Sequence, residues 1–183
     1  DNMQQKHLPP KLRYNLWKFF IYNLSHRRNF ITILSIYFLT LPNTTAQQIG
    51  IFTAAASVTS FLFEIPTGYL ADRFGHKNTL ILAKIFMILS LFSFIYAHSL
   101  TLFVIGSVFM SLGFACYSGT DAAFFHNLLI SFRRGKDYTK LMSRLSANIS
   151  LVSAALIVLL PFFTKISIVL PFKISLVFDF IGL

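Results

Sequence analysis

The chain has 183 residues, of which 55% are hydrophobic and only 12% are charged. A soluble domain carries about 25% charged residues, so this composition excludes a soluble enzyme, a disordered tail and a collagen-like rod. The net charge of +10 would favour a nucleic-acid partner in a soluble chain. In a membrane protein the same excess comes from basic loops, and we predict no nucleic-acid partner.

Long, unbroken apolar runs indicate an all-α, polytopic bundle of transmembrane helices within a lipid bilayer. One helical span needs about 20 residues, and the runs are too long for the strands of an outer-membrane barrel. We predict a polar N-terminal tail at residues 1–14 and a six-span bundle at residues 15–183. The six spans are expected at residues 15–41, 47–71, 78–97, 100–130, 141–163 and 166–183.

Lysine and arginine residues concentrate on every second side of these spans. The basic side holds Lys6, Lys11, Arg13, Lys18, Arg73, Lys77, Arg133, Arg134, Lys136 and Lys140. The loops on the other side hold only Lys165. Because cytoplasmic loops are enriched in Lys and Arg, the N-terminus is predicted to be cytoplasmic, in an inner or plasma membrane.

Two adjacent arginines lie near the middle of the first predicted span. An ionisable side chain in a span costs at least a few kcal/mol, so each one is a functional candidate. Arg27 and Arg28 are predicted to bind an anionic substrate group or a carboxylate partner. Alternatively, the span begins at Asn29 and both arginines lie at the membrane interface.

Two acidic residues lie inside later spans. Glu64 is expected to line the cytoplasmic end of a cavity, or to be a buried partner of Lys84 or Arg144. Asp121 is the best candidate for a proton carrier. It is equally well interpreted as a permanent partner of one of the two arginines in the first span, which would only hold the bundle together.

The short loop between the second and third predicted spans carries the most specific motif. It reads Gly68-Tyr-Leu-Ala-Asp72-Arg73-Phe-Gly75-His-Lys77-Asn-Thr-Leu80. Gly75 permits a tight turn, and Gly68 lets a neighbouring helix approach closely. Asp72 ends one helix, where it can face the positive end of another helix's dipole.

This motif resembles the signature G-x-L-A-D-R-x-G-R-K-x-x-L of the major facilitator superfamily of secondary transporters. His76 replaces the first of the two basic residues. Two further runs extend the resemblance toward a branch that includes drug exporters, Glu64-Ile-Pro66-Thr-Gly68 and Ser118-Gly119-Thr120-Asp121-Ala122. The similarity covers the chain from about Asn15 to its end, as one six-span half of a transporter.

The resemblance implies alternating access around a central site, with a small organic molecule as substrate. A proton or substrate gradient would drive transport, and export is slightly favoured over uptake. The loop would act as a conformational gate, whose charge contacts hold one state of the transporter, through Gly68, Asp72, Arg73, Gly75 and Lys77. The exchange to His76 would make the gate pH-sensitive. The alternative is a loop that only sets the topology.

A complete member of that superfamily has a second six-span half, which is expected as the partner of this one. The chain begins at Asp1 and stops at Leu183 within an apolar run, so we expect a longer protein. No metal-ligand spacing and no phosphate-binding loop is present, and no cofactor is predicted. The alternatives are a self-contained six-span homodimer and a polytopic membrane enzyme, although the only aqueous-side cluster is basic.

Overall fold

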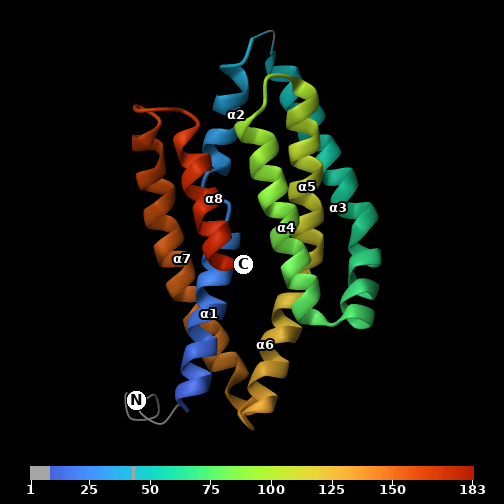
Figure 1. Ribbon diagram of the computed structural model, residues 1–183, viewed down its shortest axis with the longest axis vertical. Coiled ribbons are helices and arrows are strands. Elements are labelled where there is room, and N and C mark those ends of the chain that lie inside the picture. The colour runs from blue at the N-terminus through green and yellow to red at the C-terminus, as the bar shows by residue number, and fades with distance from the viewer. Residues whose placement is uncertain (1–8, 43) are drawn as a thin grey trace.

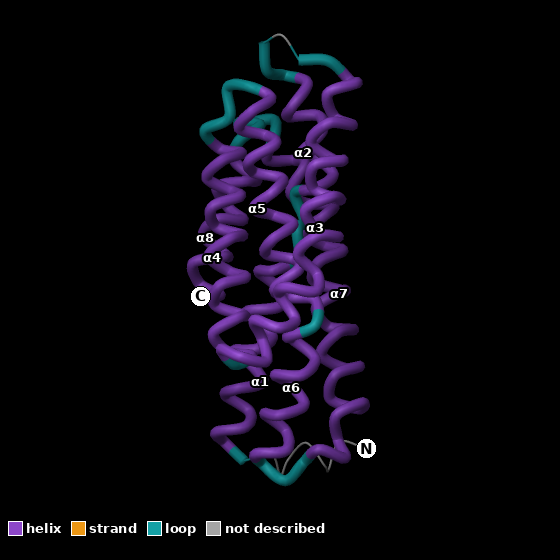
Figure 2. Tube along the Cα trace, turned by 90° about the vertical axis from the view of Figure 1, so that its right-hand side faces the viewer, coloured by secondary structure: helices purple, strands orange, loops and turns teal. Residues whose placement is uncertain are grey.

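The computed structural model describes residues 9–42 and 44–183, and within these residues it contains helices and no strand (Figure 1). The prediction of an all-α fold is confirmed. The elements are α1 (Pro10–His26), α2 (Ile31–Leu39), α3 (Ala46–Phe74), α4 (His76–Ile95), α5 (Leu100–Ser118), α6 (Thr120–Ser131), the short 3-10 helix η2 (Gly135–Asp137), α7 (Tyr138–Phe163) and α8 (Leu170–Gly182). Figure 2 shows them as a long bundle with most of its loops at the two ends.

Four helical stretches in the described part of the chain are long and apolar enough to cross a membrane. They are Ala46–Phe74, His76–Ile95, Leu100–Ser131 and Gly135–Phe163. They agree with the second to fifth predicted spans to within a few residues. The first and sixth predicted spans do not form such helices, because one is broken and α8 has only 13 residues. The structure therefore does not confirm six spans.

The predicted first span is two helices, because its polar middle leaves the helical path. Arg27 adopts an extended conformation after α1. The backbone then turns, with the Asn29 N–H donating to the Arg27 carbonyl and the Ile31 N–H to the Arg28 carbonyl, both at 3.0 Å. These bonds satisfy backbone groups that a helix break would otherwise leave unpaired in lipid. α1 also begins at Pro10, inside the predicted tail, since proline suits a first helical turn.

A second interruption separates α5 from α6 at Gly119. The described helices can therefore be divided into two successive groups, α1 to α4 and α5 to α8. Each group begins with an interrupted helix, α1–α2 in the first and α5–α6 in the second, and two further helices follow. Asp121 lies in the first turn of α6, where the positive end of the helix dipole favours a carboxylate. The arginines of residues 27 and 28 follow the C-terminus of α1, where the dipole favours cations.

The turn between α3 and α4 is built around Gly75, whose φ of 85° is in the left-handed region. Glycine adopts this conformation without the steric cost that a side chain brings. The expected tight turn at this position of the motif is confirmed. The turn lies in the lower part of Figure 1, on the side of the beginning of α1 and the α6–α7 connection.

Close helix contact within the bundle depends on α4 and α5. A Cβ atom on Gly113 would lie 2.9 Å from the Met87 side chain and 3.0 Å from the Ala83 carbonyl oxygen. Phe103, fully buried on α5, lies among the rings of Tyr37, Phe38, Phe52 and Phe94. A smaller cluster joins α1 to α6 through Leu12, Phe19, Phe125 and Leu129.

Gly113→Ala should destabilise the protein by about 1–3 kcal/mol, because the added methyl group collides with the α4 backbone. Gly50→Ala is the matched control, since Gly50 lies in α3 and a methyl group added there would have no atom within 4 Å. The control should be neutral, or stabilising by up to about 1 kcal/mol through helix propensity. Thermal unfolding in detergent measures both, and equal effects would contradict the α4–α5 packing.

Candidate functional site

Three charged side chains from distant parts of the sequence meet inside the bundle. Asp179 of α8 accepts from Arg28 Nη1 at 2.7 Å through one carboxylate oxygen, and from Lys84 Nζ of α4 at 3.0 Å through the other. All three residues are buried, with exposed fractions of 7% for Arg28 and 0% for the other two. We call Arg28, Lys84 and Asp179 the buried triad.

Neighbouring groups make further contacts with the buried triad, although Arg28 Nη2 is buried without a hydrogen-bond partner among the described residues. Lys84 Nζ donates to Ser25 Oγ at 2.9 Å and lies 4.6 Å from the centre of the Tyr22 ring. Arg28 Nε points to the Met87 sulfur at 3.1 Å. Gly182 packs directly on Ser25, so that no side chain would fit there. These contacts fix α8 and α4 against the end of α1.

The buried triad corrects two pairings left open by the sequence. Arg28 pairs with Asp179, not with Asp121, and Lys84 also pairs with Asp179, not with Glu64. Charges desolvated in lipid need a partner close at hand, and Asp179 is the acid nearest both cations. This role of Asp179 was not predicted, because its only signal in the sequence is an acidic residue within an apolar run.

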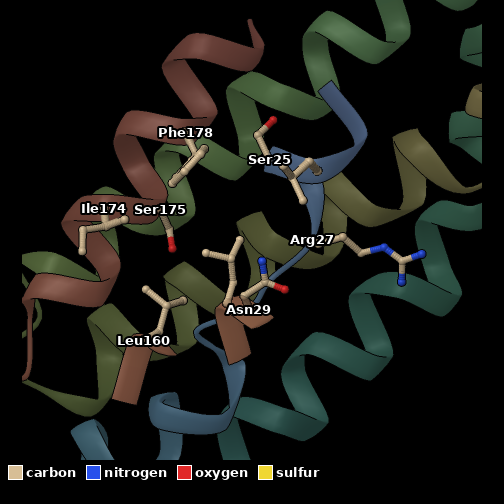
Figure 3. A pocket seen from close by; sticks show the side chains of 9 residues that line it. Ser25, Arg27, Asn29, Leu160, Ile174, Ser175 and Phe178 are labelled. Carbon is tan, nitrogen blue, oxygen red and sulfur yellow. The ribbon is translucent and has the colours of Figure 1, made fainter. Parts of the chain in front are cut away.

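Arg27 takes a different direction from Arg28, since the chain is extended at this point. Its side chain is exposed, and in Figure 3 it extends away from Ile174, Ser175 and Phe178. The pocket in Figure 3 has a cavity volume of only about 20 Å³, room for about one water molecule. Arg27 is therefore the arginine of the two that is open to binding.

A larger cavity of about 350 Å³ opens between α3 and α5. It is lined by Ser60, Glu64, Phe114, Ala115, Tyr117 and Ser118. Glu64 is exposed, and its carboxylate makes no hydrogen bond or ion pair with the part of the chain that the structure describes. Beside the cavity, the Thr67 hydroxyl lies 3.1 Å from the Ala115 carbonyl and ties α3 to α5.

Tyr117 connects this cavity to the first interruption of the bundle. Its hydroxyl donates to the Asn23 side chain, and its ring stacks on His26 at a centroid distance of 4.0 Å. Asp121 interacts with the same hydroxyl, and Arg27 is near enough to attract it electrostatically. Tyr117 was not among the predicted site residues, although its place four residues before Asp121 is a helical neighbour spacing.

The sequence-derived gate motif lies on the surface of the described structure. Asp72, Arg73, Gly75 and Lys77 are all exposed. Gly68 is exposed as well, and a methyl group added to it would have no atom within 4 Å, so the expected close helix approach does not occur among the described residues. The N-terminus of α4 has no side-chain cap, and so Asp72 does not serve it. The exposed charges of Asp72, Arg73 and Lys77 can therefore contact a second protein domain, and Arg73 also lies beside Tyr69 and Phe74 of its own helix.

A family model described as Major Facilitator Superfamily matches residues 19–183. The match runs from within α1 to the end of α8 and includes the buried triad, the cavity and the loop motif. It confirms the resemblance read from the motif at residues 68–80. No curated protein and no solved structure gives a significant match.

Removing the carboxylate that Arg28 and Lys84 share should destabilise the protein. Asp179→Asn leaves two buried cations without an anion, and we expect a loss of about 3–5 kcal/mol in the free energy of unfolding. Asp137→Asn is the control, because its 3.3 Å pair with Arg134 is partly exposed and is worth about 1 kcal/mol or less. Denaturant unfolding in detergent compares the two.

A triple variant separates charge from packing at the same place. Arg28→Met, Lys84→Met and Asp179→Leu together remove every charge of the buried triad while keeping apolar volume. The triple variant should be more stable than Asp179→Asn alone, since replacing a whole buried ion cluster by apolar groups is often neutral. A triple variant that unfolds more readily than the single one would contradict the explanation that Asp179→Asn is destabilising because it leaves two buried cations unpaired.

Proposed function

We propose that this chain, which belongs to the Major Facilitator Superfamily, transports a small organic molecule across a membrane by alternating access. The superfamily consists of transporters, and the apolar helices make the chain a multi-pass membrane protein. The chain would supply the N-terminal six-span half, with α1 and α2 as one interrupted span and α8 as the sixth. A second half, facing the cavity between α3 and α5, would complete the binding site.

The observation that carries this proposal is the open cavity beside two interrupted helices. Transporter sites lie near the bilayer midplane, where discontinuous helices offer charged and polar groups. Arg27 and Asp121 lie at the interruptions at residues 27–30 and after Gly119, and both interact electrostatically with Tyr117, which lines the cavity together with Glu64. A ligand cannot reach the buried triad, so we place the substrate at the face of α3 and α5 that holds the cavity. We call this the open face.

The proposed orientation puts the N-terminus in the cytoplasm, in an inner or plasma membrane. The α3–α4 turn and the α6–α7 connection lie on the side of the beginning of α1 in Figure 1, and both are basic. The connections at residues 40–42, 44–45, 96–99 and 164–169 lie at the other end, and the Lys or Arg residue that these described segments hold is Lys165. Positive loops on one side support this orientation.

The exposed motif supports a gating role at the cytoplasmic end. Asp72→Asn should reduce transport at least about tenfold while the amount of protein in the membrane is unchanged, because an uncharged amide cannot hold a closed state by a charge contact. Asp137→Asn is the matched control, a partly exposed carboxylate at another loop on the same side.

The assay uses proteoliposomes of the protein as its gene encodes it, with a panel of labelled small organic molecules. Transport by the Asp72→Asn variant at the rate of the unmodified protein would contradict the gating role. A panel in which no compound crosses faster than in protein-free liposomes would count against transport itself.

Asp121 is proposed to carry the coupling proton. Asp121→Asn should abolish accumulation driven by a pH gradient yet keep exchange of labelled for unlabelled substrate, since exchange needs no net proton movement. Both modes are measured in the same proteoliposomes. If the variant still accumulates substrate in response to the pH gradient, another group carries the proton.

A further inference from the structure

We propose that the cavity between α3 and α5 binds a monovalent organic cation with an aromatic or apolar body, and that Glu64 is its counter-charge. This inference rests on the transport function proposed above and names the class of substrate. It replaces the anionic group expected from the two arginines in the sequence. The reasons lie in the charges, the walls and the preorganisation of the cavity.

The net charge of the open face is negative after the charges that pair with each other are subtracted. Arg28 is bound to Asp179 and is absent from this face. Among the described residues Arg27 is near this face, and it lies within electrostatic range of Asp121, whose carboxylate offsets its charge while it is deprotonated. Glu64 remains as a carboxylate without a partner in the described residues. A cation at Glu64 makes the face neutral, whereas an anion would leave it more negative.

Glu64 lies deep enough in the membrane for this charge to matter. It is ten residues before the end of α3 at Phe74, which is about 15 Å along a helix with a rise of 1.5 Å per residue. A lone carboxylate near the bilayer centre costs at least a few kcal/mol, and intramembrane acids accordingly occur opposite a cation or an aqueous path. A cation that binds beside Glu64 removes this cost, and this gain in free energy favours binding.

The walls of the cavity suit the body of such a ligand. Two aromatic rings line the cavity, Phe114, which is 36% exposed, and Tyr117, together with the small side chain of Ala115. An aromatic ring attracts a cation that lies over its face. Ser60 and Ser118 add neutral hydroxyl groups to the lining. No lysine or arginine lines this cavity in the described structure.

The Tyr117 ring is held in place before any ligand arrives. Its hydroxyl is bound to Asn23, and its face stacks on His26, which is itself 3% exposed. Phe114 meets the same imidazole edge to face at 5.3 Å. A ring fixed by two contacts loses little conformational freedom when a ligand binds, which preserves affinity.

The test uses two probes of nearly the same shape and opposite charge, tetraphenylphosphonium and tetraphenylborate. Binding of each is measured by equilibrium dialysis against the detergent-solubilised protein as its gene encodes it, with protein-free micelles as the blank. The unmodified protein should bind the phosphonium and not the borate. Glu64→Gln should weaken phosphonium binding by about tenfold, and Glu64→Asp should weaken it less.

Asp137→Asn, which removes one partly exposed negative charge far from the cavity in sequence, should leave phosphonium binding unchanged. Size-exclusion elution of the Glu64→Gln variant checks that it is folded. Phosphonium binding that survives Glu64→Gln, a preference for the borate, or binding of neither probe overturns the cation assignment. Transport of a neutral or anionic compound in proteoliposomes, without phosphonium binding, would overturn this inference and leave the transport function standing.

Discussion

One carboxylate, Asp179, pairs with two buried cations and so joins three helices that are remote in the sequence. The buried triad closes the bundle around the end of α1, where the chain must leave its helical path. Without Asp179, Lys84 and Arg28 would be unpaired charges in an apolar interior, which costs several kcal/mol. With it, the break in the first span is fixed, and Arg27 turns out of the bundle while Arg28 turns in.

This arrangement divides the polar groups of the membrane interior into two sets. The closed set is the buried triad with Ser25 and Tyr22, which holds α1, α4 and α8 together. The open set is the face of α3 and α5 with Glu64, to which we assign the substrate. Tyr117 lies between the sets, since it stacks on His26 and lines the cavity.

Local features of this fold were readable from the sequence, and long-range ones were not. The apolar runs predicted α3, α4 and the α5–α6 stretch, and glycine at position 75 predicted the turn. The polar run at residues 23–29 signalled an irregularity in the first span, yet the length needed to cross a bilayer favoured one helix over α1 and α2. Arg28 and Asp179 are 151 residues apart, and residue periodicity carries information only within a helix. The partner of each charge therefore required the structure.

The most direct test of this division is the water accessibility of two serines on the same helix. Cys116, the chain's single cysteine, is first replaced by alanine, and Ser118→Cys or Ser107→Cys is then introduced. Ser118 lines the open cavity, whereas Ser107 is 1% exposed. A membrane-impermeant maleimide should alkylate the cysteine at position 118 and spare that at position 107, because only a thiol in water reacts. Equal protection at both positions would contradict an aqueous cavity between α3 and α5.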